Sequence, residues 1–309
     1  MPNVKHKKAS AKADGADASL VRPSDWNDEH VVDQYLDLPT LGAPPAAPAA
    51  SPGDTRLFGR NRGGRRMLSM VGPSGLDTAL QPALFSNGVA LWLPGTGTTA
   101  AINFGVPWTV AATQAHPQIA ATNFHAQIRR ATYTTAATAG SASGVRAGAP
   151  VCFRGGGSGM GGFYAVFRFG FVALVSGMQF WAGLSATSAA LAGDPSAVNN
   201  TACVGMDAAD TNLQLVFRDG AAATKVNLGA APVADHFYEA VFFCPPSGSS
   251  ITARVQRLND GVVLADNTVH TANVVQATAL LYPRAEVRNG AAAAAAAISL
   301  SRIYVETDN

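Results

Sequence analysis

Alternation of apolar and polar side chains with a period of two residues is the feature that most constrains this sequence. It is clearest in segments 251–258 and 262–266, which flank an Asn-Asp-Gly turn at 259–261. Such a turn between two alternating segments is a strong signal for a β-hairpin. From about residue 86 onward, strand-like segments recur at ~8–15-residue spacing with few helical patterns between them. This spacing predicts an all-β domain, a sandwich or jelly roll.

The expected strands are spread over the whole of that domain. They cover residues 124–133, 151–154, 163–175, 178–185, 202–207, 213–218, 224–228, 236–244, 251–258, 262–266, 279–287 and 298–306. Two earlier short strands, 55–59 and 67–71, are expected around a turn at 61–64. In the last strand, the alternation places Ile298, Leu300 and Tyr304 inward and Ser299 and Ser301 outward.

Two segments admit a second interpretation. Residues 163–184 are apolar and long enough to cross a membrane. However, Arg168 lies centrally, glycines interrupt the segment and its phenylalanines alternate, so we expect two buried strands broken near Ser176 and Gly177, and no membrane partner. The alanine run 291–297 favours a helix by propensity. The Asn-Gly turn before it and the alternation after it favour a loop that leads into a strand.

The low charge content and an arginine-rich segment bear on which partners the chain can have. Charged residues make up 14% of the chain, against about 25% in a typical soluble domain. A chain with so few charges stays soluble if partners cover much of its surface, which favours an oligomer or a larger assembly. A genome of high GC content, in which codons for Ala and Gly are frequent, would give the same composition. An arginine block at 56–66 can contact phosphates. A solvated or partner-facing segment, for instance one that meets the acidic block 25–37 of a neighbouring copy, is the favoured interpretation, and nucleic acid is not an expected partner.

No motif for catalysis, metal binding or cofactor binding is present in the sequence. The six histidines have no metal-ligand spacing, and the glycine-rich segment 155–162 lacks the lysine of a phosphate loop. No pair of carboxylates can be nominated for glycan hydrolysis. Cys152, Cys203 and Cys244 each lie in an apolar context and are expected to be buried thiols, as suits assembly in a reducing cytoplasm. We therefore predict no enzyme, no cofactor, no metal site and no catalytic residue.

Three parts of the chain differ in composition. Residues 1–42 form an N-terminal segment with a basic start and no secretory signal, 43–85 a Pro/Ala linker with a short β connector, and 86–309 the β-sandwich. A short helix is expected at about 25–35, capped by Ser24 or Asp25. Trp26 is too large for so short a piece to bury, so it either anchors on a partner or packs back on its own domain.

Residues 21–31 also carry a family resemblance. Their Pro-Ser-Asp-Trp-Asn run followed by a histidine resembles the N-terminal segment of many tail-fibre and related virion proteins of tailed bacteriophages, and residues 71–85 resemble a second segment of such proteins. Residues 283–306 are similar to the last strands of their concanavalin-like domains. The resemblance implies a cofactor-free homotrimer that docks on other virion proteins by its N-terminus. The docking residues that it implies are Pro23, Ser24, Asp25, Trp26, Asn27 and His30.

The leading hypothesis is therefore a structural virion protein, a fibre or fibre-base component that is assembled in the host bacterial cytoplasm and projects a trimeric jelly-roll or concanavalin-like β-sandwich. An extended N-terminal segment with a short helix precedes this all-β domain. The alternatives are a capsid decoration protein or a lectin-like receptor-binding module that recognises host surface glycans. In the last case, Trp108, Trp181 or Tyr282 would stack on sugars from loops, although core packing is the favoured interpretation for all three. A depolymerase is a third hypothesis, and it requires polysaccharide cleavage.

Overall fold

The structure, a computed structural model, describes residues 40–41, 45, 56–71, 77–79, 88–95, 101–111, 113–156 and 161–307. The chain divides into two units, 1–40 and 41–309, and in the first of them only Thr40 is described. The helix expected at about 25–35 lies outside the described residues. Apart from Thr40, the first residue of β1 (Thr40–Leu41), the described residues all belong to the second unit.

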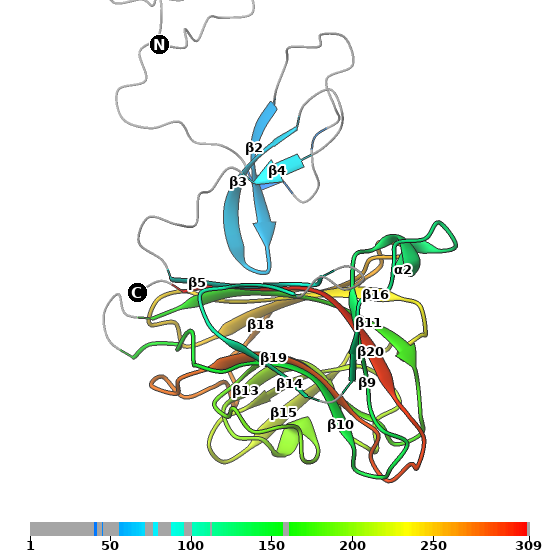
Figure 1. The fold of residues 1–309 in the computed structure, drawn as a ribbon. Helices are drawn as coiled ribbons and strands as arrows, with labels where there is room; N and C mark the ends of the chain where they lie inside the picture. Colours follow the sequence, from blue (N-terminus) through cyan, green and yellow to red (C-terminus); the bar gives the residue numbers. More distant parts are fainter. Residues whose placement is uncertain are drawn as a thin grey trace, which may run out of the picture. The chain divides into compact units, whose positions relative to one another are not determined.

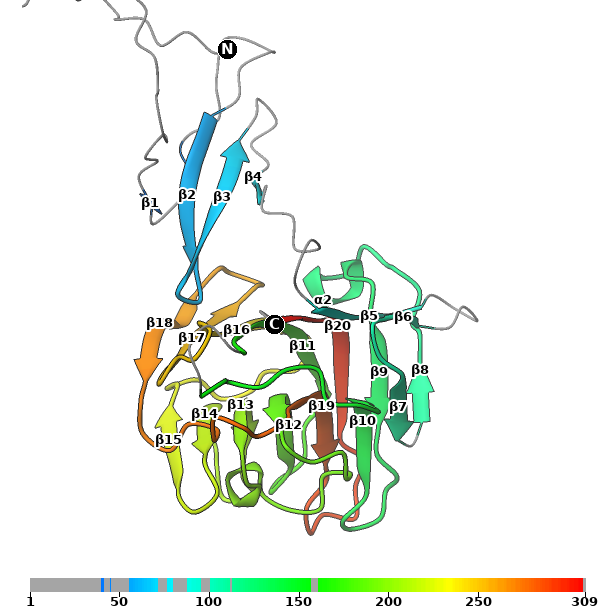
Figure 2. The same ribbon diagram turned by 90° about the vertical axis from the view of Figure 1, so that its left-hand side faces the viewer.

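Two antiparallel sheets pack face to face in a sandwich (Figure 1). The seven-stranded sheet runs, in the order that Figure 2 shows, through β15 (Ala223–Asn227), β14 (Gln214–Arg218), β13 (Thr201–Met206), β12 (Gln179–Ser185), β19 (Tyr282–Arg288), β10 (Ala142–Ala147) and β7 (Trp108–Ala111). The nine-stranded sheet contains β18 (Val263–His270), β17 (Ile251–Arg257), β16 (Phe237–Cys244), β11 (Phe163–Ala173), β20 (Ala297–Thr307), β5 (Gly88–Leu93) and β6 (Ile102–Phe104), with β9 (Ala131–Thr134) on β20 and β8 (Thr113–Ala115) on β9. The predicted all-β sandwich is confirmed.

A smaller sheet precedes the sandwich in the sequence. It has the strand order β1 (Thr40–Leu41), β2 (Arg56–Arg62), β3 (Arg65–Val71) and β4 (Asp77–Ala79). The hairpin of β2 and β3 extends the two predicted strands and turns over Gly63 and Gly64, because Arg62 pairs directly with Arg65. Both glycines have positive φ, 62° and 89°, as a two-residue hairpin turn requires.

Aromatic side chains from both sheets fill the space between them. Phe169 and Phe171 on β11 are fully buried, and the ring centroid of Phe169 lies 4.8 Å from that of Phe180 and 5.7 Å from that of Tyr238. The segment considered as a membrane span is thus two sandwich strands, β11 and β12, separated by a turn at Gly177. None of the helices within the described residues has the length and apolarity to cross a membrane.

A β-bulge changes which residues of β20 face the core. Arg168 on β11 pairs with Arg302, but the next residue, Phe169, pairs with Leu300. Ser301 is therefore an extra residue on β20, and the alternation reverses across it. Ile298 and Leu300 point inward as predicted, but Tyr304 lies on the outer face, where it lines a cavity. The prediction for Tyr304 is wrong because sequence alternation alone does not reveal a bulge.

Segment 124–133 is the main correction to the predicted strands. Its first part is a helical turn, α2 (Phe124–Gln127), and β9 begins only at Ala131. The side chain of Asn123 accepts a hydrogen bond of 2.7 Å from the Ala126 amide, which caps the helix. The consecutive residues His125 and Ala126 are both buried and Phe124 is 39% exposed, so burial does not alternate as it would in a strand.

Other predictions have mixed outcomes. The alanine run is turn and coil until β20 begins at Ala297, so a loop leading into a strand is confirmed. The three cysteines are free and buried, as expected. Segment 151–154 is not a strand, because Cys152 makes a single isolated bridge with Leu281.

Burial of His125 predicts acid sensitivity. Its Nε2 lies 3.0 Å from Ser299 Oγ, and burial, reinforced by Arg130 and opposed by Asp235, lowers its pKa from 6.5 to about 4. Between these pH values the unfolded chain binds a proton that the folded chain does not. The unfolding free energy is therefore expected to fall by about 3 kcal/mol as the pH drops from 6.5 to 4, and to be insensitive to this group above that window.

Urea denaturation of the wild type and of His125→Gln across this pH range measures the effect. The wild type should lose stability more steeply than the variant. His116 and His270, whose pKa values burial also lowers, supply a remaining slope in both proteins. Equal slopes in the two proteins would contradict the assignment to His125.

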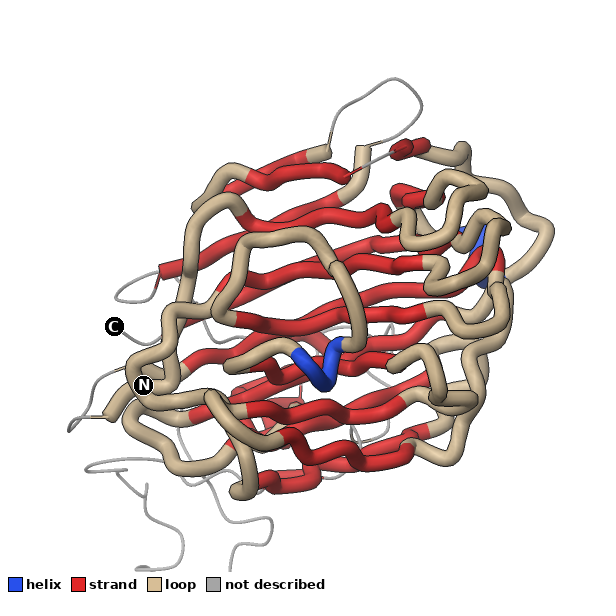
Figure 3. The backbone as a smooth tube through the Cα atoms, turned by 90° about the horizontal axis from the view of Figure 1, so that it is seen from below, coloured by secondary structure: helices blue, strands red, loops and turns tan. Residues whose placement is uncertain are grey.

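The outer face of the seven-stranded sheet is covered by its own loop. The segment that joins β12 to β13 carries η1 (Pro195–Ala197) and crosses this face (Figure 3). Its Leu191 packs with Trp181, Cys203 and Val216 in a separate apolar cluster. This cover keeps the outward side chains of β12, β13 and β14 away from solvent.

A charged cluster is buried beside that apolar patch. Arg284 and Glu286 on β19 form an ion pair and are both fully buried. Arg146 Nη1 lies 2.9 Å from Glu286 Oε1, and the Arg284 guanidinium lies 4.3 Å from the ring centroid of Trp181. Arg284 also donates to the carbonyl oxygens of Thr187 and Ala189 in the covering loop. The loop and the sheet are thus joined by a desolvated charge network.

The two ends of the sandwich lie side by side. Gly88, the first residue of β5, pairs with Thr307, the last residue of β20. Chain that enters the sandwich and chain that leaves it therefore meet at one edge of the nine-stranded sheet.

Candidate functional site

The docking residues implied by the resemblance lie outside the described residues, and their role stays a prediction. They are Pro23, Ser24, Asp25, Trp26, Asn27 and His30.

The three aromatic residues considered for sugar stacking lie on strands and not on loops. Trp181 on β12 is fully buried beneath Arg284, so the favoured interpretation of packing is confirmed for it and the alternative of sugar stacking is wrong. Trp108 on β7 is half-buried and packs against the core. Tyr282 on β19 is also half-buried and pairs with Ser185.

The tip of the β2–β3 hairpin contacts the outer face of the nine-stranded sheet. A Cβ atom on Gly63 would lie 2.5 Å from a methyl carbon of Val241, and one on Gly64 would lie 2.8 Å from Thr252. The Gly64 amide donates a hydrogen bond of 3.1 Å to the side chain of Asn267. Glycine is therefore required at the tip both by the turn and by its close approach to β16 and β17.

An arginine fixes the second strand of the hairpin to the same face. Arg65 donates two hydrogen bonds to Glu306 on β20, of 2.7 and 2.9 Å, and its guanidinium lies 5.3 Å from the ring centroid of Tyr164. Bidentate pairing of this kind is among the stronger polar contacts in proteins. Tyr304 donates a further hydrogen bond of 3.0 Å to Glu306.

Three adjoining cavities lie along this outer face, with volumes of about 210, 180 and 290 Å³. The first two share Arg62 and Glu239, and the first and third share Arg168 and Arg302, so together they form one groove. We call it the arginine groove, after the arginines that line it: Arg60, Arg62, Arg129, Arg168, Arg254 and Arg302.

Positive charge is in excess along the arginine groove. Among the described residues that line it, the carboxylates are Glu239, Glu306 and Asp266, half the number of the arginines. Arg168 Nε lies 2.6 Å from Glu239 Oε2. Burial lowers the pKa of Arg302, and the neighbouring Arg168 lowers it further. The contribution of Arg168 is a repulsion between guanidinium groups, which Glu239 opposes, and each arginine stays charged at neutral pH.

The third cavity combines cationic and apolar walls. Arg129, Arg168 and Arg302 line it together with Leu93 and Ile128. Within the described part of the chain, Arg129 and Arg302 have no carboxylate at ion-pair distance, and Arg129 Nε lies 3.5 Å from the Gly95 carbonyl oxygen. A guanidinium presents planar paired donors that match a carboxylate or a phosphate. This cavity therefore has the chemistry of an anion site.

Part of this groove was detectable in the sequence. The arginine block at 56–66 stands out there, and one of its members, Arg65, meets Glu306 of the same chain. The interpretation of that block as wholly solvated or partner-facing is wrong for Arg65. Arg168 and Arg302 gave no signal, because only the pairing of β11 with β20 brings them together.

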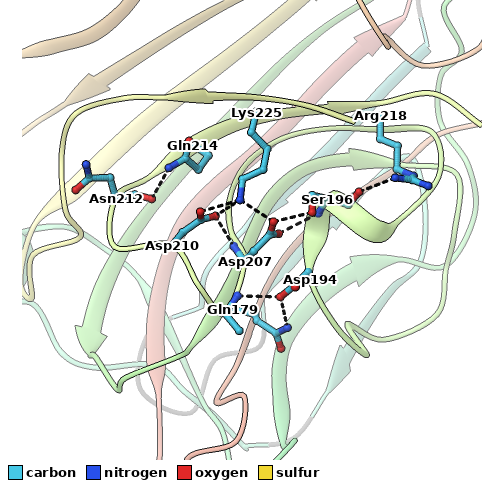
Figure 4. Close-up of polar contacts among 10 residues, drawn as sticks. Gln179, Asp194, Ser196, Asp207, Asp210, Asn212, Gln214, Arg218 and Lys225 are labelled. Atoms are coloured by element: carbon cyan, nitrogen blue, oxygen red, sulfur yellow. Dashed lines mark hydrogen bonds and ion pairs between the residues drawn. The ribbon is translucent and has the colours of Figure 1, made fainter. Parts of the chain in front are cut away.

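A second polar cluster lies at the edge of the seven-stranded sheet (Figure 4). Lys225 Nζ lies 2.7 Å from Asp207 Oδ2 and 2.6 Å from Asp210 Oδ2. Burial opposes ionisation of Asp207, but hydrogen bonds from Lys225 and Ser196 outweigh it and lower its pKa. The lysine thus occupies the space between the carboxylates as an internal cation. Among the described residues, no group of three or more His, Cys, Asp or Glu is placed to hold a metal ion.

Comparison with known proteins finds similarity in the structure of the sandwich and none in the sequence. No family model matches the sequence, and no curated protein matches it. A protein of unknown function from Shewanella oneidensis MR-1 has a similar structure, with a TM-score of 0.49, 12% identity, and coverage of 74% of this chain and 89% of that chain. Basic winged bean lectin (TM-score 0.47, 9% identity) and peanut lectin (0.45, 10%) are also similar, and each match covers 72% of this chain and 98% of the lectin. These similarities are similarities of the β-sandwich.

Proposed function

We propose that this chain is a non-enzymatic structural protein of a tailed-phage virion, a fibre or fibre-base component. In this proposal its N-terminal segment docks on the particle and a trimeric β-sandwich is displayed. The pairing of Gly88 with Thr307 is the observation that carries the proposal. Because both ends of the sandwich meet at one edge, residues 1–87 connect to it there, and its loops and faces remain available for display apart from the part of the outer face that the β2–β3 hairpin contacts. The resemblance of residues 21–31 to virion attachment segments supports the same assignment.

Deletion of residues 1–42 tests the docking role. Expressed during infection, the truncated chain is expected to fold and to form trimers, because the sandwich core lies within residues 88–307. Its incorporation into particles should fall to background, as measured by immunoblotting of gradient-purified virions. Phe104→Ala in the full-length chain, at an exposed position of β6, serves as the matched control and should be incorporated normally. Incorporation of the truncated chain at the full-length level would refute the proposal.

The second candidate function is recognition of a saccharide by the displayed sandwich. The arginine groove is the observation that favours it, because six arginines and three carboxylates line one continuous surface. The two roles are compatible, since docking would use the N-terminal segment and recognition would use the outer face of the nine-stranded sheet.

A capsid decoration protein is the remaining alternative to a fibre component. Immunogold labelling of particles distinguishes a position on a fibre from a position on the capsid.

A further inference from the structure

We propose that the arginine groove binds an anionic polysaccharide, whose carboxylate or phosphate group is held between Arg129 and Arg302. The proposal deepens the saccharide-recognition role and rests on it. It arises from the juxtaposition of guanidinium groups, acceptors for hydroxyl protons and apolar side chains along one groove.

The anion subsite is the cavity of about 290 Å³ beside β5 and β20. Three guanidinium groups line it, and the nearby carboxylate of Glu239 engages Arg168. The charge of Arg129 and Arg302 therefore remains for a ligand. The apolar wall of Leu93, Pro94 and Ile128 limits the access of water, which strengthens an ion pair formed there.

The adjoining cavities favour a hydroxyl-rich chain. Glu239 and Asp266 offer acceptors for hydroxyl protons. The side-chain amides of Asn267 and Gln256 already hydrogen-bond within the chain through both oxygen and nitrogen, and each keeps one further N–H and one further lone pair. Tyr304 adds a half-buried aromatic edge. A polymer with hydroxyl groups along its length and negative groups at intervals matches this alternation of arginines and acceptors.

A nucleic acid matches the groove less well. Its negative charge recurs at every nucleotide, so phosphates would also face Glu239 and Asp266. Single strands need exposed aromatic faces on which bases stack. Tyr164 is only 6% exposed, and Arg65 lies over its ring. The ring of Tyr164 is therefore not available for a base to stack on.

The length of the groove favours a chain over a single sugar. On the nine-stranded sheet, its lining residues come from six neighbouring strands, from Asp266 on β18 to Leu93 on β5, and the β2–β3 hairpin supplies further lining residues. At roughly 4.8 Å between strands, the groove extends for roughly 24 Å across the sheet. A polymer can therefore engage the anion subsite and the acceptors near Glu239 at the same time.

Binding of full-length protein to immobilised polymers tests the proposal. The probes are hyaluronate, which carries one carboxylate for every two sugars, a phosphodiester-linked glycan polymer, neutral dextran and single-stranded DNA. We expect binding to at least one of the two anionic polysaccharides, weakening as salt rises, and no binding to dextran. The response to the first two probes distinguishes carboxylate from phosphate recognition. Binding to neither of them, or tighter binding to DNA, would overturn the proposal.

Matched variants locate the site. Arg302→Gln is expected to weaken binding roughly 10- to 100-fold, the usual effect of losing a hydrogen bond to a charged group. Arg302→Lys should recover part of the loss, because it keeps the charge without the planar fork. Arg257→Gln removes the same charge at the exposed β17–β18 turn, where Arg257 pairs with Asp260, and should change affinity less than twofold.

Equal losses for Arg302→Gln and Arg257→Gln would show diffuse charge attraction and would contradict the assigned subsite. Thermal unfolding of each variant separates a loss of binding from a loss of folding. Incorporation of Arg302→Gln into virions should be normal, because the groove lies outside the docking segment. Failure of polysaccharide binding therefore leaves the structural role intact, and failure of the truncation test leaves the groove intact.

Discussion

Glu286→Gln is expected to lower the free energy of unfolding by about 3–5 kcal/mol, the usual cost of removing one partner from a buried ion pair. Glu286 is fully buried and compensates two arginines, Arg284 and Arg146. Glutamine keeps the size of the side chain but removes its charge, so a fully buried guanidinium loses its counter-charge. Domains are stable by only about 5–15 kcal/mol, so this single change removes a large share. Chemical denaturation at neutral pH measures it.

Two comparisons make that prediction specific. Asp260→Asn removes a carboxylate from an exposed pair with Arg257 and is expected to leave stability almost unchanged. Combining Arg284→Met with Glu286→Gln should cost less than the sum of the two single changes, because the double variant contains no buried arginine at 284 to compensate. Additive losses, or a Glu286→Gln effect as small as that of Asp260→Asn, would show that the pair is not desolvated in solution.

Phe169→Ala is expected to lower the free energy of unfolding by a similar amount, about 3–5 kcal/mol. Its ring lies between the two sheets and contacts Phe171, Phe180 and Tyr238. Since these neighbours belong to β11, β12 and β16, they cannot all move into the space that the ring leaves. The loss of unfolding free energy therefore includes the cost of a cavity as well as the loss of buried apolar surface. Urea denaturation monitored by tryptophan fluorescence is the measurement.

Phe104→Ala provides the control for Phe169→Ala. It removes the same atoms from β6, where the side chain is 56% exposed, and should cost less than about 1 kcal/mol. Similar losses at the two positions would mean that the aromatic cluster is not the centre of the folded core.

Local signals explain what the sequence predicts well. The hairpin between β17 and β18 follows from an Asn-Asp-Gly turn, because turn chemistry and alternation act over a few neighbouring residues. The two strands β11 and β12 follow from alternating aromatics in the same way. The errors arise where a local detail overrides the alternation. Asn123 caps a helical turn in place of a strand, and the extra residue Ser301 reverses the facing of Tyr304.

The candidate site was largely beyond the reach of sequence analysis. Arg168 and Arg302 are far apart in the chain, and only strand pairing makes them neighbours. Trp181 is the opposite case, a residue that the sequence suggests for a site but that the fold buries. Its residue type is suited to binding sugars, but the loop between β12 and β13 covers its face of the sheet. Which outer face is covered and which is open depends on the paths of loops, and residue periodicity does not encode these paths.

The meeting of Gly88 with Thr307 has a consequence for how such a chain can evolve. A domain whose ends are adjacent can be exchanged as a cassette, if the replacement brings its own ends to the same spacing and presents a face that the β2–β3 hairpin can contact. If the sandwich binds a ligand and residues 1–42 dock, as we propose, such an exchange would change the first property and leave the second untouched. Under that proposal, ligand preference and docking could vary independently of one another.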